Sequence, residues 1–122
     1  MNPFSLNGKT ALITGGATGL GLAMTRCMVE AGAKVIVVAR SAPEKVNEAL
    51  RPLGDRVSYY QGDVSKPDTV PALVQQILLR EGPIHILVNN AGNHCKKPIE
   101  DMETEEFAAV LQTHLVGSFA LT

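Results

Sequence analysis

The sequence predicts an α/β fold in which helices cover both faces of a doubly wound parallel sheet. Three observations predict it. Apolar runs with the length of strands alternate with amphipathic helical patterns along the 122 residues. A glycine-rich turn joins the first such strand to the first helix. The β-branched run 34–39 is typical of a parallel strand that is buried on both faces. We expect right-handed βαβ connections within one domain, 1–122.

The first strand, turn and helix are expected around the apolar run 10–13 and the glycines after it. Glycine allows backbone angles that a Cβ forbids and lets a ligand approach the main chain. The following helix points unpaired N–H groups and its positive dipole end at the turn, which suits a diphosphate. Taken alone, Gly15-x-x-x-Gly19-x-Gly21 could be a plain turn with close helix packing, because it is not G-x-G-x-x-G. The helix face expected to be buried comprises Leu20, Ala23, Met24, Cys27, Met28 and Ala31.

The second strand and helix follow directly. Gly32 ends the first helix, and the run 34–39 is the second strand. Ser41 and Glu44 have the spacing of a capping box, with a proline between them in the first helical turn. We expect this helix to end near 52–54, where proline and glycine interrupt the pattern.

The third and fourth strands are expected at 57–60 and 84–88, the latter fully buried. Between them lies a helix that must hold Pro71 in its first turn. The acidic stretch 100–106 predicts the start of a last helix, because its charges are favourable at a helix N-terminus. The expected buried faces are Val70, Leu73, Val74, Ile77 and Leu78 in the third helix, and Phe107, Val110, Leu111, His114, Leu115 and Ser118 in the last.

Composition excludes several function classes. The formal net charge of −1 suggests neither nucleic acid nor an anionic membrane surface as a partner. No apolar run is long enough to span a membrane, and residues 1–9 lack the pattern of a signal peptide. Two cysteines do not make a disulfide framework, and we expect Cys27 to be a small core residue and Cys95 to lie in a loop. We expect a cytoplasmic protein without a bound metal.

The distinctive segments all follow predicted strands, so they meet at the edge where a doubly wound sheet binds its ligand. In order along the chain, 14–21, Asp63-Val64 and Asn89-Asn90-Ala91-Gly92 resemble the motifs of the short-chain dehydrogenase/reductase family. The resemblance covers the chain from about Leu6 to its end. It implies a Rossmann-like sheet with strand order 3-2-1-4 and an NAD- or NADP-dependent oxidoreductase that acts on alcohols or ketones.

The resemblance also implies roles for individual residues. Asp63 would bond the adenine amino group while Val64 flanks the ring, although Asp63 could simply stabilise its loop. Asn89 and Asn90 could likewise only cap a strand. By the same resemblance the diphosphate and adenosine ribose would be wrapped by Gly15, Thr18, Gly19, Leu20 and Gly21, and the nicotinamide ribose would be lined by Asn90, Ala91 and Gly92.

The end of the second strand favours NADP over NAD. NAD-preferring relatives place an acidic residue where this chain has Ala39, and Arg40 and Ser41 follow, so nothing there repels a 2′-phosphate. Against this, many NADP-dependent relatives carry a basic residue just before the second glycine, where this chain has Thr18. Arg40 could also be a solvated charge and Ser41 only a helix cap.

Two departures from the family concern catalysis. His114 stands where the family has an asparagine of its proton-relay group; it could hold a water or carry a proton, or be a satisfied core residue. The family's Tyr-x-x-x-Lys segment is absent, and Tyr59 and Tyr60 lie in a predicted strand. We therefore assign no catalytic residue and expect the cofactor-binding part of a larger enzyme, inactive by itself.

Other hypotheses stay open at this stage. The chain could be a non-catalytic dinucleotide-binding module or redox sensor, or a fragment that binds nothing well. The loop 94–97 could face the substrate, and its two lysines could favour an anionic substrate such as a sugar acid, but a solvated loop explains them too. The apolar edge of the predicted strand 84–88 would pair with other polypeptide, so we expect a homo-oligomer.

Overall fold

The structure, a computed structural model, describes residues 3–92 and 98–122 of the chain. Within these residues one parallel sheet has four strands, β1 (Thr10–Thr14), β2 (Lys34–Ala39), β3 (Val57–Gln61) and β4 (Ile86–Val88). They lie in the order β3-β2-β1-β4. The predicted Rossmann-like sheet, including the strand order 3-2-1-4, is confirmed.

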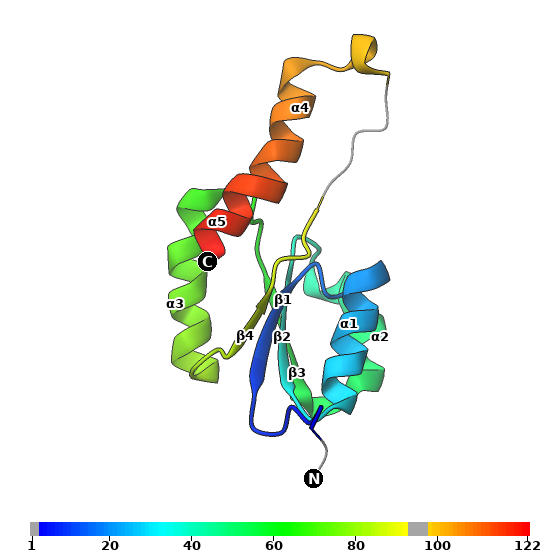
Figure 1. The fold of residues 1–122 in the computed structure, drawn as a ribbon, viewed down its shortest axis with the longest axis vertical. Helices are drawn as coiled ribbons and strands as arrows, with labels where there is room; N and C mark the ends of the chain where they lie inside the picture. Colours follow the sequence, from blue (N-terminus) through cyan, green and yellow to red (C-terminus); the bar gives the residue numbers. More distant parts are fainter. Residues whose placement is uncertain (1–2, 93–97) are drawn as a thin grey trace.

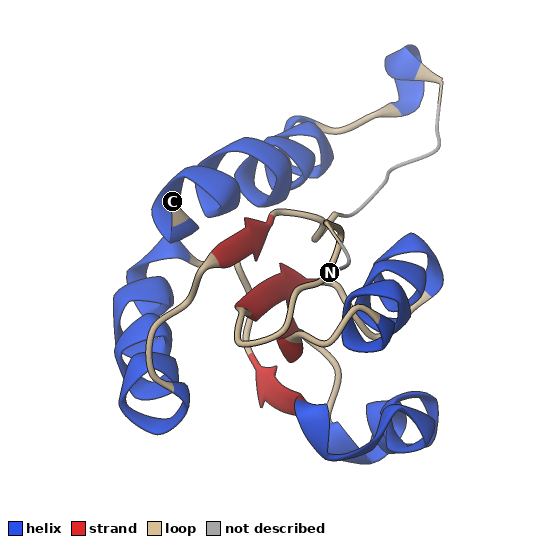
Figure 2. Cartoon of the chain, turned by 60° about the horizontal axis from the view of Figure 1, so that its bottom comes forward, coloured by secondary structure: helices blue, strands red, loops and turns tan. Residues whose placement is uncertain are grey.

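Helices cover both faces of this sheet. Helices α1 (Gly19–Glu30) and α2 (Pro43–Leu50) lie on one face, and α3 (Val70–Glu81) lies on the other, so the strands run between two helical layers (Figures 1 and 2). The side chains of β2 alternate between these layers. Val35 and Val37 pack in the cluster under α1 and α2, whereas Ile36 and Val38 pack with Ile77 of α3. The expected burial of this strand on both faces is confirmed.

Three features around α2 and α3 can be compared with expectation. Pro71 lies in the first turn of α3, and Gly82 ends that helix with φ of +79°, as predicted. The capping box at Ser41 is wrong: α2 begins one residue later, with Ala42 as its N-cap and no side-chain cap. The 3₁₀ segments η1 (Arg51–Arg56) and η2 (Pro67–Thr69) complete the connections.

The buried face of α1 agrees with the predicted one only in part. Met24 and Met28 pack partly buried against the core, as predicted. Leu20 is 72% exposed and Cys27 is exposed as well, so the expected core role of Cys27 is wrong. The buried residues of the helix are Gly21 and Thr25. The Thr25 hydroxyl is fully buried and lies 3.0 Å from the Gly16 carbonyl oxygen and 2.9 Å from that of Gly21. Close backbone approach and this hydrogen bonding, together with the packing of the two methionines, set the rotation of the helix.

The last helix has three parts after a short 3₁₀ turn, η3 (Ile99–Asp101): α4 (Thr104–Leu111), a π-helical turn η4 (Gln112–Gly117) and α5 (Ser118–Leu121). In Figure 1, α4 extends beyond the sheet, whereas α5 lies beside α3. The predicted buried face is wrong here too. Phe107 and Leu115 are 55% and 63% exposed, and the buried residues of this segment are Thr113 and Gly117.

Strand β4 is shorter and less buried than expected. Only Ile86–Val88 form the strand, and all three are half-buried, because β4 is the edge of the described sheet. Just before it, His85 pairs with β1 differently: the Thr10 N–H donates to His85 Nδ1 at 3.0 Å, and the His85 N–H donates to the Thr10 oxygen at 2.9 Å. No helix in the described part of the chain is long and apolar enough to cross a membrane.

Candidate functional site

The glycine turn after β1 is built by close backbone contacts. Gly15 has φ of +68°, and its N–H donates to the Val38 oxygen at 2.7 Å. A Cβ on Gly21 would lie 2.0 Å from the Gly15 oxygen, so only glycine lets α1 start this close to the turn. Thr18 is the N-cap of α1 but makes no side-chain cap. The first N–H groups of α1 therefore remain available to an anionic ligand.

The loop after β4 is tied to the same turn. The Thr14 hydroxyl oxygen accepts hydrogen bonds from the N–H groups of Asn90 and Ala91, at 3.0 and 2.9 Å. The Asn90 side-chain amide donates to the Gly15 oxygen at 3.2 Å. Sequence reasoning did not include Thr14 in the site, although it begins the glycine motif. These bonds make the ends of β1 and β4 one continuous surface.

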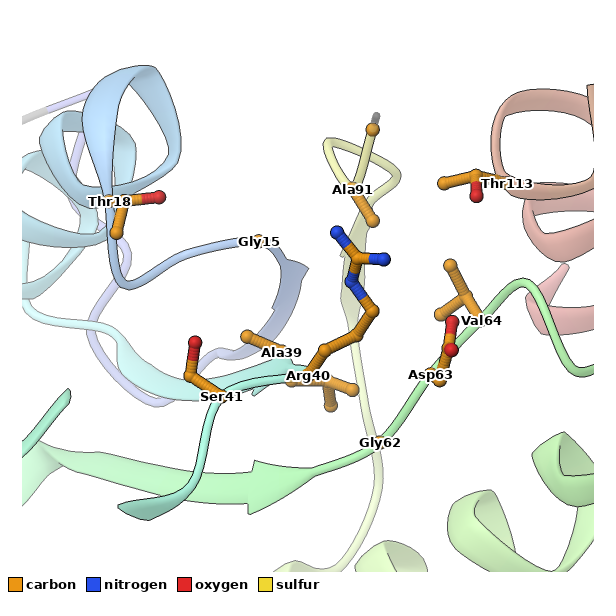
Figure 3. Close-up of a pocket in the computed structure, with 12 residues that line it drawn as sticks. Gly15, Thr18, Ala39, Arg40, Ser41, Gly62, Asp63, Val64, Ala91 and Thr113 are labelled. Atoms are coloured by element: carbon orange, nitrogen blue, oxygen red, sulfur yellow. The ribbon is translucent and has the colours of Figure 1, made fainter. Parts of the chain in front are cut away.

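A cavity of about 160 Å³ lies at this edge of the sheet, where the strands end (Figure 3). Eight of the residues expected in the site line it. The expected residues Gly19, Leu20, Gly21 and Asn90 do not line it; Gly21 and Asn90 instead hold the turn. The lining residues are Gly15, Thr18, Val38, Ala39, Arg40, Ser41, Gly62, Asp63, Val64, Ala91, Gly92 and Thr113.

Arg40 and Asp63 are the charged residues among those that line the cavity. In Figure 3 the Arg40 side chain extends toward Ala91, between Ser41 on one side and Asp63 on the other. Asp63 Oδ1 accepts hydrogen bonds from Ser65, from its N–H at 2.9 Å and its hydroxyl at 2.6 Å.

The pKa of Asp63 reflects this setting. Burial raises it, but the two hydrogen bonds from Ser65 and the charges of Arg40 and Lys66 lower it more, so the pKa of Asp63 lies below its ordinary value. The carboxylate is therefore ionised at neutral pH. Its contact with Ser65 shows that Asp63 does stabilise its loop, which was the alternative to a role at the adenine.

The two tyrosines are engaged elsewhere. The Tyr59 hydroxyl donates to the Ala39 oxygen at 3.1 Å and also contacts the Ser41 oxygen, and burial raises the pKa of Tyr59. Tyr60 lies on the other face, where its hydroxyl is 3.4 Å from Glu81 Oε1. Burial and the charge of Glu81 raise the pKa of Tyr60 as well. Both phenols hold their protons more tightly than a free tyrosine does.

The last helix contributes three residues that contact the site, of which only His114 was singled out from the sequence. Thr113 lines the cavity, and Gly117 lies so close to the loop after β3 that a Cβ would be 2.3 Å from the Val64 oxygen. A Cβ on Gly92 would lie 2.6 Å from Cε1 of His114. The small residues four positions apart, Thr113 and Gly117, were the signal for a close approach. The loop 94–97 lies outside the described residues.

Comparison with known proteins extends the similarity over nearly the whole chain. The model of the short chain dehydrogenase family matches residues 9–122. The 2-dehydro-3-deoxy-D-gluconate 5-dehydrogenase of Formosa agariphila is 37% identical over 122 residues, which are 98% of this chain and 46% of that protein. The chain thus spans about half the length of the curated relatives it matches.

Solved structures give the same result. A gluconate 5-dehydrogenase from Burkholderia cenocepacia, in complex with NADP and tartrate, is 34% identical with a TM-score of 0.85, over 97% of this chain and 47% of that one. The L-sorbose reductase from Gluconobacter frateurii, complexed with NADPH and L-sorbose, is 32% identical with a TM-score of 0.87, over 97% and 46%. Because the family model matches residues 9–122 and the solved structures share its fold, the chain belongs to the short-chain dehydrogenase/reductase family of oxidoreductases.

Proposed function

We propose that this chain is the cofactor-binding half of an oxidoreductase that transfers hydride between NADP(H) and an alcohol or ketone. One observation carries the preference for NADP: Arg40 lines the cavity at the end of β2, and the position before it is Ala39 rather than an acidic residue. A 2′-phosphate there would meet the positive charge of Arg40 and no acidic side chain at position 39.

The residues in and around the cavity suit the separate parts of a dinucleotide. The open N-terminus of α1 and the glycine turn would bind the diphosphate through backbone N–H groups, with Thr18 beside it. Asp63 would accept a hydrogen bond from the adenine amino group through Oδ2, because Oδ1 already binds Ser65. The nicotinamide supplies the hydride when it is bound, while these residues hold and orient it.

Arg40 and Ser41 would bind the 2′-phosphate. A hydrogen bond to a charged group contributes about 1.5–3 kcal/mol, which corresponds to roughly ten- to hundredfold in affinity. Arg40 is exposed to solvent, so salt should screen its interaction with the 2′-phosphate. The contribution of this interaction to NADPH affinity should therefore decrease as the salt concentration rises.

The test is titration of NADPH and NADH against the wild type and Arg40→Ala, followed by cofactor fluorescence. We expect Arg40→Ala to weaken NADPH binding roughly tenfold or more and to leave NADH binding unchanged. The matched control is Arg56→Ala, because Arg56 is also exposed but precedes β3, at the opposite end of the sheet. Equal affinity of the wild type for both cofactors would refute the preference for NADP.

Turnover is proposed to need more polypeptide than this chain. Neither Tyr59 nor Tyr60 lines the cavity and both hydroxyls are engaged in hydrogen bonds, which supports the alternative that the chain alone is a non-catalytic dinucleotide-binding module. We expect no NADPH oxidation by the 122-residue chain with ketones, ketoses and keto sugar acids, the classes suggested by the named relatives. Turnover that His114→Ala abolishes would contradict this and make His114 catalytic.

A further inference from the structure

His114 lies directly against the loop that follows β4. A Cβ built on Gly92 would be 2.6 Å from Cε1 and 3.1 Å from Nε2 of the His114 imidazole. Gly92 is not among the glycines with positive φ, so its backbone conformation is open to other residues. A side chain at this position would meet the imidazole, which would have to move because it is the end of an exposed side chain.

The loop is therefore held from two sides. On one side Thr14 accepts hydrogen bonds from the N–H groups of Asn90 and Ala91. On the other side the His114 ring packs on Gly92, the next residue along the loop. Because Ala91 and Gly92 both line the cavity, a shift of the ring would shift the cavity wall.

The π-helical turn places the backbone of His114 beside the loop. Its residue Thr113 is buried and lines the cavity, and Gly117 is in close contact with the Val64 oxygen. The turn therefore contacts the loops after β3 and β4 within five residues. A π-turn adds one residue to a helical turn and is often found at functional sites. These two contacts place the backbone of the turn, and from it the exposed His114 side chain reaches Gly92.

We propose that His114 is a positioning residue, whose imidazole presses the loop of Asn90, Ala91 and Gly92 toward Thr14 and thereby places the nicotinamide half of the cofactor. The inference rests on the proposed function. The adenosine half would lie at Arg40 and Asp63, at the ends of β2 and β3, away from this contact. Loss of the ring should therefore affect the two halves of the cofactor differently.

The experiment compares NADPH with adenosine 2′,5′-bisphosphate, which carries only the adenosine half. His114→Ala should weaken NADPH binding about fivefold or more and leave the bisphosphate affinity unchanged. The matched control is Leu115→Ala, because Leu115 lies on the same turn and is 63% exposed. This variant should bind both ligands as the wild type does. A merely structural role of His114 would weaken both ligands together, and this outcome, like no change in either, would overturn the proposal.

A second variant tests the contact itself. Gly92→Ala should weaken NADPH binding while His114 is present and should have little further effect in the His114→Ala background, so that the two changes are not additive. Additive effects would overturn the proposal. A wild type that binds the bisphosphate as tightly as NADPH would overturn this inference and leave the cofactor site standing. A wild type that binds neither ligand would overturn the proposed function and this inference with it.

Discussion

Replacement of Gly21 by alanine should destabilise the chain, although alanine is the better helix former. Gly21 is the third residue of α1, and a Cβ there would lie 2.0 Å from the Gly15 oxygen and 2.5 Å from Nδ2 of Asn90. Two backbone segments would have to separate, and the hydrogen bond from Asn90 to Gly15 would break.

The magnitude follows from three opposing effects. Overpacking costs about 1–3 kcal/mol, and the upper end applies because backbone atoms must move. Loss of the hydrogen bond adds about 1 kcal/mol. The higher helix propensity of alanine stabilises the variant by about 1 kcal/mol. The net loss is about 3 kcal/mol, which lowers a urea midpoint by roughly 1.5 M if the m-value is about 2 kcal/mol/M.

The assay is urea unfolding followed by far-UV circular dichroism, with Gly19→Ala as the matched control. Gly19 lies in the same turn with φ of +53°, and a Cβ there would meet nothing within 4 Å. Its replacement should lower the free energy of unfolding by only about 1–2 kcal/mol, which is the cost of placing a residue with a Cβ in the left-handed conformation. If Gly21→Ala is as stable as Gly19→Ala, or more so, the close contact between α1 and the turn does not exist in solution.

Three further predictions concern the rest of the molecule. Burial raises the pKa of Glu81, but hydrogen bonds and the charge of Lys34, 2.6 Å away, lower it more, so the pKa lies below its ordinary value of 4.5. The ionised form of Glu81 therefore stabilises the fold above that pH, and this stabilisation is lost as the pH falls through the lowered pKa. In Glu81→Gln the urea unfolding midpoint should decrease less with falling pH than in the wild type. Thr25→Val should cost about 1–3 kcal/mol in thermal unfolding, because it leaves the buried oxygen of Gly16 without the hydroxyl, whereas Thr25→Ser should retain the bond. The open edge at Ile86–Val88 should make the chain associate as concentration rises in sedimentation velocity, and a monomer at every concentration would contradict this.

Sequence periodicity predicted the elements that depend on hydrophobic burial. Residues 35–38 of β2 are buried because their four β-branched side chains face helices on both sides, and this is what the composition of the strand indicated. The glycine turn was equally clear, because positive φ at Gly15 and Gly19 requires the residue that the sequence shows.

Periodicity failed where backbone contacts, rather than apolar area, decide which face is buried. In α1 the buried residues are Gly21 and Thr25, which carry no strong hydrophobic signal, whereas the predicted Leu20 is exposed and the predicted Met24 and Met28 are only partly buried. In the last helix the buried residues Thr113 and Gly117 are also small. An unbroken 3.6-residue period cannot describe a helix that contains a π-turn.

The length of the π-turn between α4 and α5 affects which residues lie at the cavity. A π-turn holds one residue more than a regular helical turn, so a relative that lacks one residue of Gln112–Gly117 can form a regular turn there and keep α5 in the same place. A change in length that the turn does not absorb would instead rotate α5 and bring a side chain to where Gly117 meets the Val64 oxygen, in a place without room for a Cβ. When this chain is aligned with its relatives, a one-residue gap in this segment is therefore compatible with the same residues of α5 facing the cavity. Equivalent positions beyond it should be assigned from superposed structures rather than from residue counts.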